Sequence, residues 1–109
     1  MFRGRVRREE RLKKELKRIL RRLKKFYKPD KVILFGSLVE GKIHSGSDID
    51  LLIIKKSKKR YLDRIDEFLD IVKPKIALDV FILAPEEVKN NPYVREILKI
   101  GKVIYEKVG

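Results

Sequence analysis

The sequence predicts a small α/β (α+β) protein in which a mixed β-sheet is flanked by helices. Three observations support this: helical spacing of apolar residues near the N-terminus, short apolar runs typical of buried strands, and the alternation of the two along the chain. The chain has 109 residues, of which 43% are hydrophobic and 41% charged. This length and composition predict a single domain over residues 1–109, with one core.

The first expected element is a basic amphipathic helix over about residues 8–27. Its apolar side chains recur three or four positions apart, which places them on one stripe of a helix. Pro29 follows the expected end of this helix. The stripe consists of Leu12, Leu16, Ile19, Leu20, Leu23, Phe26 and Tyr27.

Four strands are expected after this helix. The first three are apolar runs of the kind found in buried strands, and the last is a short segment that closes the chain. The expected strands are residues 31–35, 48–54, 76–83 and 102–106.

Helices are expected between these strands. Residues 61–72 have apolar side chains at helical spacing, and a helical turn can start after residue 37. Pro85 and Pro92 are placed as the first residues of two further helices, because proline is well tolerated in a first turn. The last helix is expected to end at Ile100, before Gly101.

Composition excludes several classes of protein. The chain has no cysteine, which excludes disulfides, a thiol nucleophile and a zinc–thiolate site. No apolar run approaches the roughly 20 residues that span a membrane, and the N-terminus lacks the apolar segment of a signal peptide. We therefore expect a cytoplasmic protein with no membrane association, and the abundance of charged residues suggests a thermophilic source.

The positive charge is concentrated in one segment. Residues 1–31 contain 15 Lys and Arg against 4 Asp and Glu, a net charge of +11, whereas residues 32–109 contain 14 against 12, a net charge of +2. Two interpretations of the basic helix remain open. It forms a surface for RNA or an acidic partner, or it exposes a solvated outer face while its apolar stripe packs on the core.

Three aspartates form the candidate catalytic group. Asp48 and Asp50 lie two residues apart at the start of a strand, so their carboxylates project to the same side. Asp79 interrupts the apolar run 76–83, where an unpaired acid is unfavourable to bury. If the two strands are neighbours, three carboxylates meet at one rim, and such oxygen donors suit Mg²⁺ or Mn²⁺.

Gly36 and Ser37 form a candidate phosphate site. They follow the first buried strand, and the segment after them can begin a helix. Glycine lets the backbone approach a phosphate closely, while the serine hydroxyl and nearby N–H groups can donate hydrogen bonds to it. A triphosphate would then lie between this turn and the aspartates.

These motifs resemble those of a known family. Residues 35–37, Gly41, residues 47–52 and Asp79 are similar to the signature of the DNA polymerase β-type nucleotidyltransferase superfamily, and above all of its minimal nucleotidyltransferases. The resemblance covers a catalytic core of about residues 31–106, including the closing strand. It implies the nucleotidyltransferase fold, with a mixed sheet flanked by helices.

The resemblance also implies a reaction. Asp48, Asp50 and Asp79 would be the catalytic and metal-binding residues, holding two Mg²⁺ ions, with Mn²⁺ as a substitute. An acceptor hydroxyl would attack the α-phosphate of the substrate, expected to be ATP, so that AMP is transferred and pyrophosphate released. Asp79 would orient or deprotonate that hydroxyl.

The resemblance assigns the nucleotide contacts to Gly36, Ser37 and Ser47. Many relatives carry arginines just after the glycine and serine, whereas this chain has Leu38 and Glu40. The chain therefore departs from the family pattern at a position where a cation would contact phosphate.

The resemblance further implies a partner, a small helical HEPN-domain toxin that this chain would neutralise as its antitoxin. An oligomer is also possible. The alternative function is a non-catalytic module that binds RNA or an acidic protein on a degenerate nucleotidyltransferase fold. Addition of nucleotides to RNA 3′ ends is a third possibility, which shares the chemistry and would use the basic helix to hold the RNA.

Overall fold

The sheet has four strands in the order β3-β2-β1-β4. The computed structural model of the protein describes residues 2–43 and 47–108. β1 is antiparallel to both β2 and β4, whereas β2 and β3 are parallel, so the expected mixed sheet is confirmed. The strands are β1 (Lys31–Phe35), β2 (Ile49–Ile54), β3 (Leu78–Leu83) and β4 (Lys102–Glu106).

Helices α1 (Phe2–Arg22) and α3 (Tyr61–Val72) cover one face of the sheet. A π-helical turn, η1 (Leu23–Tyr27), continues α1 toward β1. Alternate residues of β2 point toward these helices because side chains on a strand alternate between faces. The main core therefore joins β2 to α1 and α3, and its fully buried members include Leu12, Ile19, Ile49, Leu51, Ile53 and Phe68.

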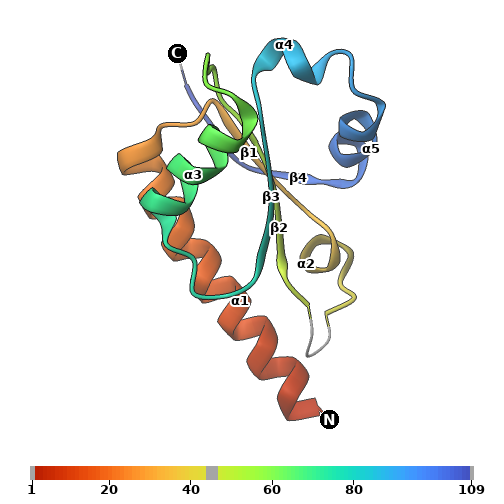
Figure 1. The fold of residues 1–109 in the computed structure, drawn as a ribbon. Helices are drawn as coiled ribbons and strands as arrows, with labels where there is room; N and C mark the ends of the chain where they lie inside the picture. Colours follow the sequence, from red (N-terminus) through yellow and green to blue (C-terminus); the bar gives the residue numbers. More distant parts are fainter. Residues whose placement is uncertain (1, 44–46, 109) are drawn as a thin grey trace.

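The opposite face of the sheet is covered by α5 (Pro92–Ile100), and α4 (Pro85–Val88) follows β3 at its edge. A second, smaller core forms here from Ile33, Leu52, Val94 and Ile97. The short helix α2 (Ser37–Glu40) starts directly after the turn that ends β1. In Figure 1, α1 continues well beyond the edge of the sheet, on the side where β2 begins.

The boundaries differ from the sequence prediction at three elements. The first helix begins at residue 2 instead of about 8, because a helix propagates readily beyond its apolar stripe once it has nucleated. β2 and β3 begin at Ile49 and Leu78, one and two residues later than predicted, because the parallel ladder starts with that pair. None of the helices in the described residues is long and apolar enough to cross a membrane.

Candidate active site

The parallel pairing of β2 and β3 brings two of the predicted catalytic aspartates together. Asp50 and Asp79 are register partners on these neighbouring strands, and their side chains share a hydrogen bond. By strand alternation, Asp50 lies on the same face as Leu52, the face covered by α5. Asp50 is half-buried and Asp79 is exposed. One carboxylate of the pair is therefore partly shielded from solvent and the other is accessible to it.

The environment of Asp50 favours its protonated form. Burial, the hydrogen bond with Asp79 and the negative charges of Asp79 and Asp48 together raise the pKa of Asp50 to about 6, and burial makes the largest contribution. A carboxylate that shares a site with other acids resists ionisation. Such perturbed carboxyl groups are concentrated at functional sites.

A glycine is required at position 36 because the backbone there lies close to Asp50. The Gly36 backbone has φ +78° and ψ −154°, a conformation open to glycine and strained for other residues. A Cβ atom at this position would collide with Oδ2 of Asp50. The antiparallel register pairs Phe35 with Asp50, so the turn that follows β1 falls beside the carboxylate.

The turn at Gly36 leads into α2 through its own hydrogen bonds. The Gly36 carbonyl accepts hydrogen bonds from the N–H groups of Val39 and Glu40, at 3.1 and 3.0 Å. Ser37 is the first residue of α2 and is half-buried. The structure thus places the glycine–serine turn and the Asp50–Asp79 pair side by side, as the motif spacing predicts.

Asp48 lies just before β2, where it is paired with an arginine of α1. Arg8 Nη2 is 3.5 Å from Oδ1 of Asp48, whose side chain is 39% exposed, and Arg8 Nε donates a 2.8 Å hydrogen bond to the Ser47 carbonyl. Ser47 itself is buried, with 3% of its surface exposed. The basic helix is therefore attached to the candidate site at the segment that carries Asp48.

Sequence reasoning missed Arg8, because a contact across 40 residues leaves no local signal. A weaker signal was present in the polar side of α1. Several charged residues of α1 recur at helical spacing beside the apolar stripe. The first of them, Arg8, reaches the segment before β2, and the others face α3 or the segment after it. These charged residues are Arg8, Arg11, Glu15, Arg18 and Arg22.

The three aspartates are not assembled into a metal site. Within residues 2–43 and 47–108, no group of three or more His, Cys, Asp or Glu side chains is placed to hold a metal ion. The donor chemistry of Asp50 and Asp79 nevertheless fits Mg²⁺ or Mn²⁺, because both ions prefer carboxylate oxygens. A divalent cation would also offset the repulsion that raises the pKa of Asp50. Arg8 would compete with such a cation for the carboxylate of Asp48.

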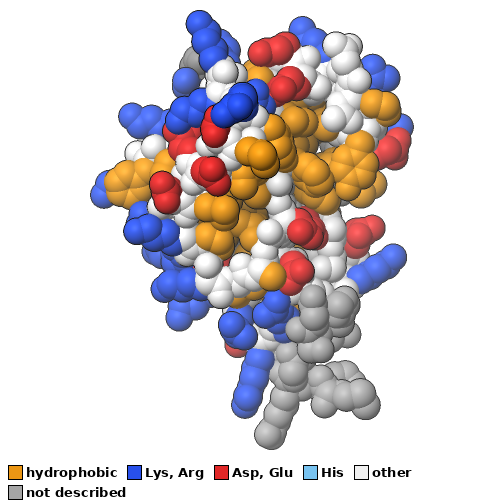
Figure 2. Space-filling view, viewed as in Figure 1, with side chains coloured by type: hydrophobic (Ala, Val, Ile, Leu, Met, Phe, Trp, Pro, Cys, Tyr) orange, Lys and Arg blue, Asp and Glu red, His pale blue; other side chains and the backbone are white. Residues whose placement is uncertain are grey.

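An aromatic cluster lies next to the aspartate pair. The rings of Phe35 and Phe81 stack with centroids 6.4 Å apart, and Phe81 meets Tyr93 edge-on at 5.6 Å. Tyr93 is 57% exposed, at the rim of this aromatic cluster. Figure 2 shows a band of hydrophobic side chains across this side of the molecule, with acidic side chains gathered directly beside it.

Comparison with known proteins identifies the family. The sequence profile of the family described as Polymerase beta, Nucleotidyltransferase matches residues 14–108. Because the match spans most of the chain, the protein belongs to this nucleotidyltransferase family. No curated protein sequence matches the chain.

Two solved structures have a similar fold. A candidate nucleotidyltransferase from Sulfolobus solfataricus has a TM-score of 0.68 at 20% identity, with 95% of this chain and 88% of that chain covered. A toxin–antitoxin structure with AMP-PNP has a TM-score of 0.52 at 18% identity, with 84% of this chain and 73% of that chain covered. These similarities confirm the nucleotidyltransferase fold.

Replacing Gly36 by alanine tests the contact with Asp50. We expect Gly36→Ala to lower the free energy of unfolding by roughly 1–3 kcal/mol, because the backbone conformation is strained for alanine and the new methyl group meets Asp50. Urea denaturation measures the change. Gly41→Ala is the control, because Gly41 also has a positive φ of +73° but has nothing within 4 Å of its added Cβ.

The double variant Gly36→Ala/Asp50→Ala separates strain from collision. Asp50→Ala removes the two atoms closest to the added Cβ, so it should restore part of the lost stability. No recovery in the double variant would contradict the proposed contact.

The raised pKa of Asp50 predicts a pH-dependent stability in metal-free protein. The pKa of Asp50 is about 6 in the folded chain, against an ordinary value of 3.8. Its stabilising contribution to the free energy of unfolding is therefore fully present below about pH 4. The contribution is lost as the pH rises to about 6. Asp50→Asn cannot ionise, so its stability relative to the parent protein should increase across this interval and then remain constant.

Thermal melting curves, recorded with a chelator at about every half pH unit between about pH 3.5 and 8, measure the difference in stability between Asp50→Asn and the parent protein. Asp70→Asn removes the same charge from an exposed position of α3 and serves as the control. Parallel stability curves for Asp50→Asn and the parent protein would rule out the raised pKa.

Proposed function

We propose that the protein is a metal-dependent nucleotidyltransferase that transfers AMP from ATP to a hydroxyl group on a partner protein. The observation that carries this proposal is the contact of the glycine–serine turn with the Asp50–Asp79 pair. This arrangement offers oxygen ligands and a close backbone approach within one small region. It is also the region that the family motif assigns to the triphosphate.

The carboxylates would have distinct roles in this reaction. Asp48, Asp50 and Asp79 would hold two Mg²⁺ ions, or Mn²⁺ in their place, and such ions activate an attacking oxygen and stabilise a leaving oxygen. Asp79 is exposed, so it can accept a hydrogen bond from an acceptor hydroxyl that arrives from solvent. The half-buried Asp50 anchors the site within the sheet.

The triphosphate would contact Gly36, Ser37 and Ser47. Of these, Gly36 and Ser37 are the more accessible, since Ser47 is buried and its carbonyl is bonded to Arg8. Leu38, which stands where many relatives have arginine, packs against the main core and adds no cation.

The proposed acceptor is a small helical HEPN-domain toxin, with this chain as its cytoplasmic antitoxin. Support comes from the fold shared with a toxin–antitoxin structure that contains AMP-PNP. Phe81 and the exposed ring of Tyr93 lie on the same face as Asp79, where a partner protein would present a hydroxyl. Exposed aromatic side chains are common anchors at protein interfaces.

A second candidate function is a non-catalytic module that binds RNA or an acidic protein. The observation that favours it is the pairing of Arg8 with Asp48, which gives one of the three proposed metal ligands a guanidinium partner. The two candidates differ in whether the chain binds ATP with Mg²⁺.

Transfer of label from ATP tests the catalytic proposal. With Mg²⁺ and the protein encoded by the neighbouring gene, label at the α-phosphate should appear on that protein, whereas label at the γ-phosphate should not. Asp48→Asn/Asp50→Asn should reduce transfer by about a hundredfold or more, and so should removal of Mg²⁺ by a chelator. Asp70→Asn should leave it unchanged.

Labelling that is unchanged in the double variant would refute the assigned catalytic residues. Titration calorimetry distinguishes the alternative: no heat with ATP and Mg²⁺, together with salt-sensitive RNA binding, would favour the non-catalytic module.

The Arg8–Asp48 pair predicts competition between α1 and a metal ion. Arg8→Gln releases Asp48, and because exposed ion pairs contribute about 0.2–1 kcal/mol, Mn²⁺ should bind up to about fivefold more tightly. Electron paramagnetic resonance of free Mn²⁺ measures the affinity. Arg7→Gln removes the same charge from an adjacent exposed position, so equal affinities of the two variants would exclude competition at Asp48.

A further inference from the structure

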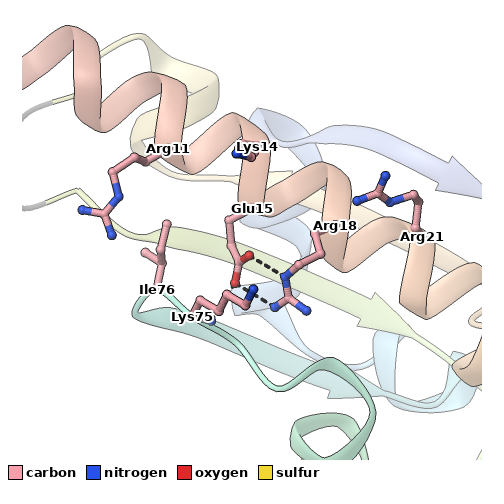
Figure 3. A pocket seen from close by; sticks show the side chains of 7 residues that line it. All are labelled: Arg11, Lys14, Glu15, Arg18, Arg21, Lys75 and Ile76. Carbon is pink, nitrogen blue, oxygen red and sulfur yellow. Dashed lines mark hydrogen bonds and ion pairs between the residues drawn. The ribbon is translucent and has the colours of Figure 1, made fainter.

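A cationic pocket lies beside α1, on the side of the molecule away from α5. Its volume is about 330 Å³. Figure 3 shows basic side chains of α1 along one wall, and Lys75 and Ile76 from the segment before β3 on the other. The lining residues are Arg11, Lys14, Glu15, Arg18, Arg21, Lys75 and Ile76.

The single acid of this pocket is already neutralised. Glu15 is 6% exposed and accepts hydrogen bonds from Nε and Nη2 of Arg18, at 2.6 and 2.9 Å. It also accepts a 2.6 Å hydrogen bond from the backbone N–H of Lys75. Arg18 in turn donates to the carbonyls of Val72 and Lys73. Glu15 and Arg18 thus fix the two walls to each other.

The other basic side chains of the pocket lack such partners. Within the described part of the chain, no acidic group forms an ion pair with Arg11, Lys14, Arg21 or Lys75. Arg18 and, to a smaller extent, Lys75 hold the pKa of Glu15 below its usual value, so the one acid of the lining faces five positive charges. Their mutual repulsion is relieved when a polyanion binds among them.

We propose that this pocket binds the phosphate backbone of a single-stranded nucleic acid. From Arg11 to Arg21 the helix rises by about 15 Å, a length that spans more than one phosphate of a nucleic-acid strand. The site therefore suits a chain of phosphates better than one isolated anion. The planar guanidinium groups of Arg11 and Arg21 also match the geometry of phosphate oxygens.

The lining favours nucleic acid over an acidic protein. Protein interfaces depend on buried apolar or aromatic anchors, and Ile76 is the one apolar side chain in the pocket lining. The exposed aromatic side chain of Tyr93 belongs to α5, on the opposite face of the sheet. The pocket and the Asp50–Asp79 pair are separate sites, so this inference does not rest on the proposed function.

Fluorescence anisotropy with a labelled oligouridylate of about 12 nucleotides, titrated with the full chain at several salt concentrations, tests the proposal. The pocket variant is Arg11→Gln/Lys14→Gln/Arg21→Gln. The matched control, Lys13→Gln/Lys17→Gln/Lys24→Gln, removes the same charge from α1 and η1 outside the lining. The pocket variant should bind at least about tenfold more weakly, with a slope of log affinity against log salt that is shallower by about 2.

The control variant should lose less than about threefold in affinity. Circular dichroism checks that both variants fold, and the single change Lys14→Glu, at an exposed position, provides a milder test that should also weaken binding. Asp48→Asn/Asp50→Asn should bind RNA no more weakly than the parent chain, even if it has lost transferase activity. This result distinguishes a failure of the nucleic-acid-binding proposal from a failure of the transferase proposal.

Parallel titrations with oligodeoxythymidylate and with a poly-glutamate peptide of the same length define the ligand. Binding of either nucleic acid that depends on the pocket residues supports the proposal. Equal losses for the pocket and control variants would overturn it, as would absence of nucleic-acid binding. Pocket-dependent binding of the peptide in preference to both nucleic acids would overturn it in favour of an acidic protein partner.

Discussion

The parallel pairing of β2 with β3 is the constraint on which the candidate site depends. It aligns Asp50 with Asp79, two groups that repel each other when ionised, near the start of both strands. The packing of Ile49, Leu51 and Ile53 against α1 and α3 stabilises this register, because a slip of one residue would turn those side chains away from the core. The burial of apolar side chains on one face of the sheet therefore compensates the repulsion between Asp50 and Asp79 on the other face.

The distribution of charge follows the same division between faces. The net charge of +13 belongs almost entirely to the first 31 residues, and thus to α1 and the turns after it. α1 buries its apolar stripe against the sheet and directs its basic side chains outward or along its seam with α3. Asp50 and Asp79 lie on the other face of the sheet, whereas Asp48 meets Arg8 of α1. The long-range field of α1 attracts polyanions without placing its cations beside Asp50 and Asp79.

Much of this fold could be predicted from the sequence because its signals are local. The apolar runs of β1 and β2, the helical spacing of α3 and the motif from Gly36 to Asp50 each lie within a short window, and the family they indicate is confirmed. The contacts of α1 could not be predicted in this way. Arg8 meets Asp48, and Glu15 meets the N–H of Lys75, across 40 and 60 residues. Such contacts depend on tertiary packing, which the spacing of apolar residues in the sequence does not reveal.

These long-range contacts give α1 a role beyond covering the core. Arg8 and Arg11 are one helical turn apart, so the contact with Asp48 and the cationic pocket are carried by one rigid element. The aromatic surface around Tyr93 and the Asp50–Asp79 pair face the other way, toward α5. A protein partner on the aromatic surface and a nucleic acid along α1 would therefore not compete for space. A chain this small can present two surfaces of opposite character because a single sheet separates them.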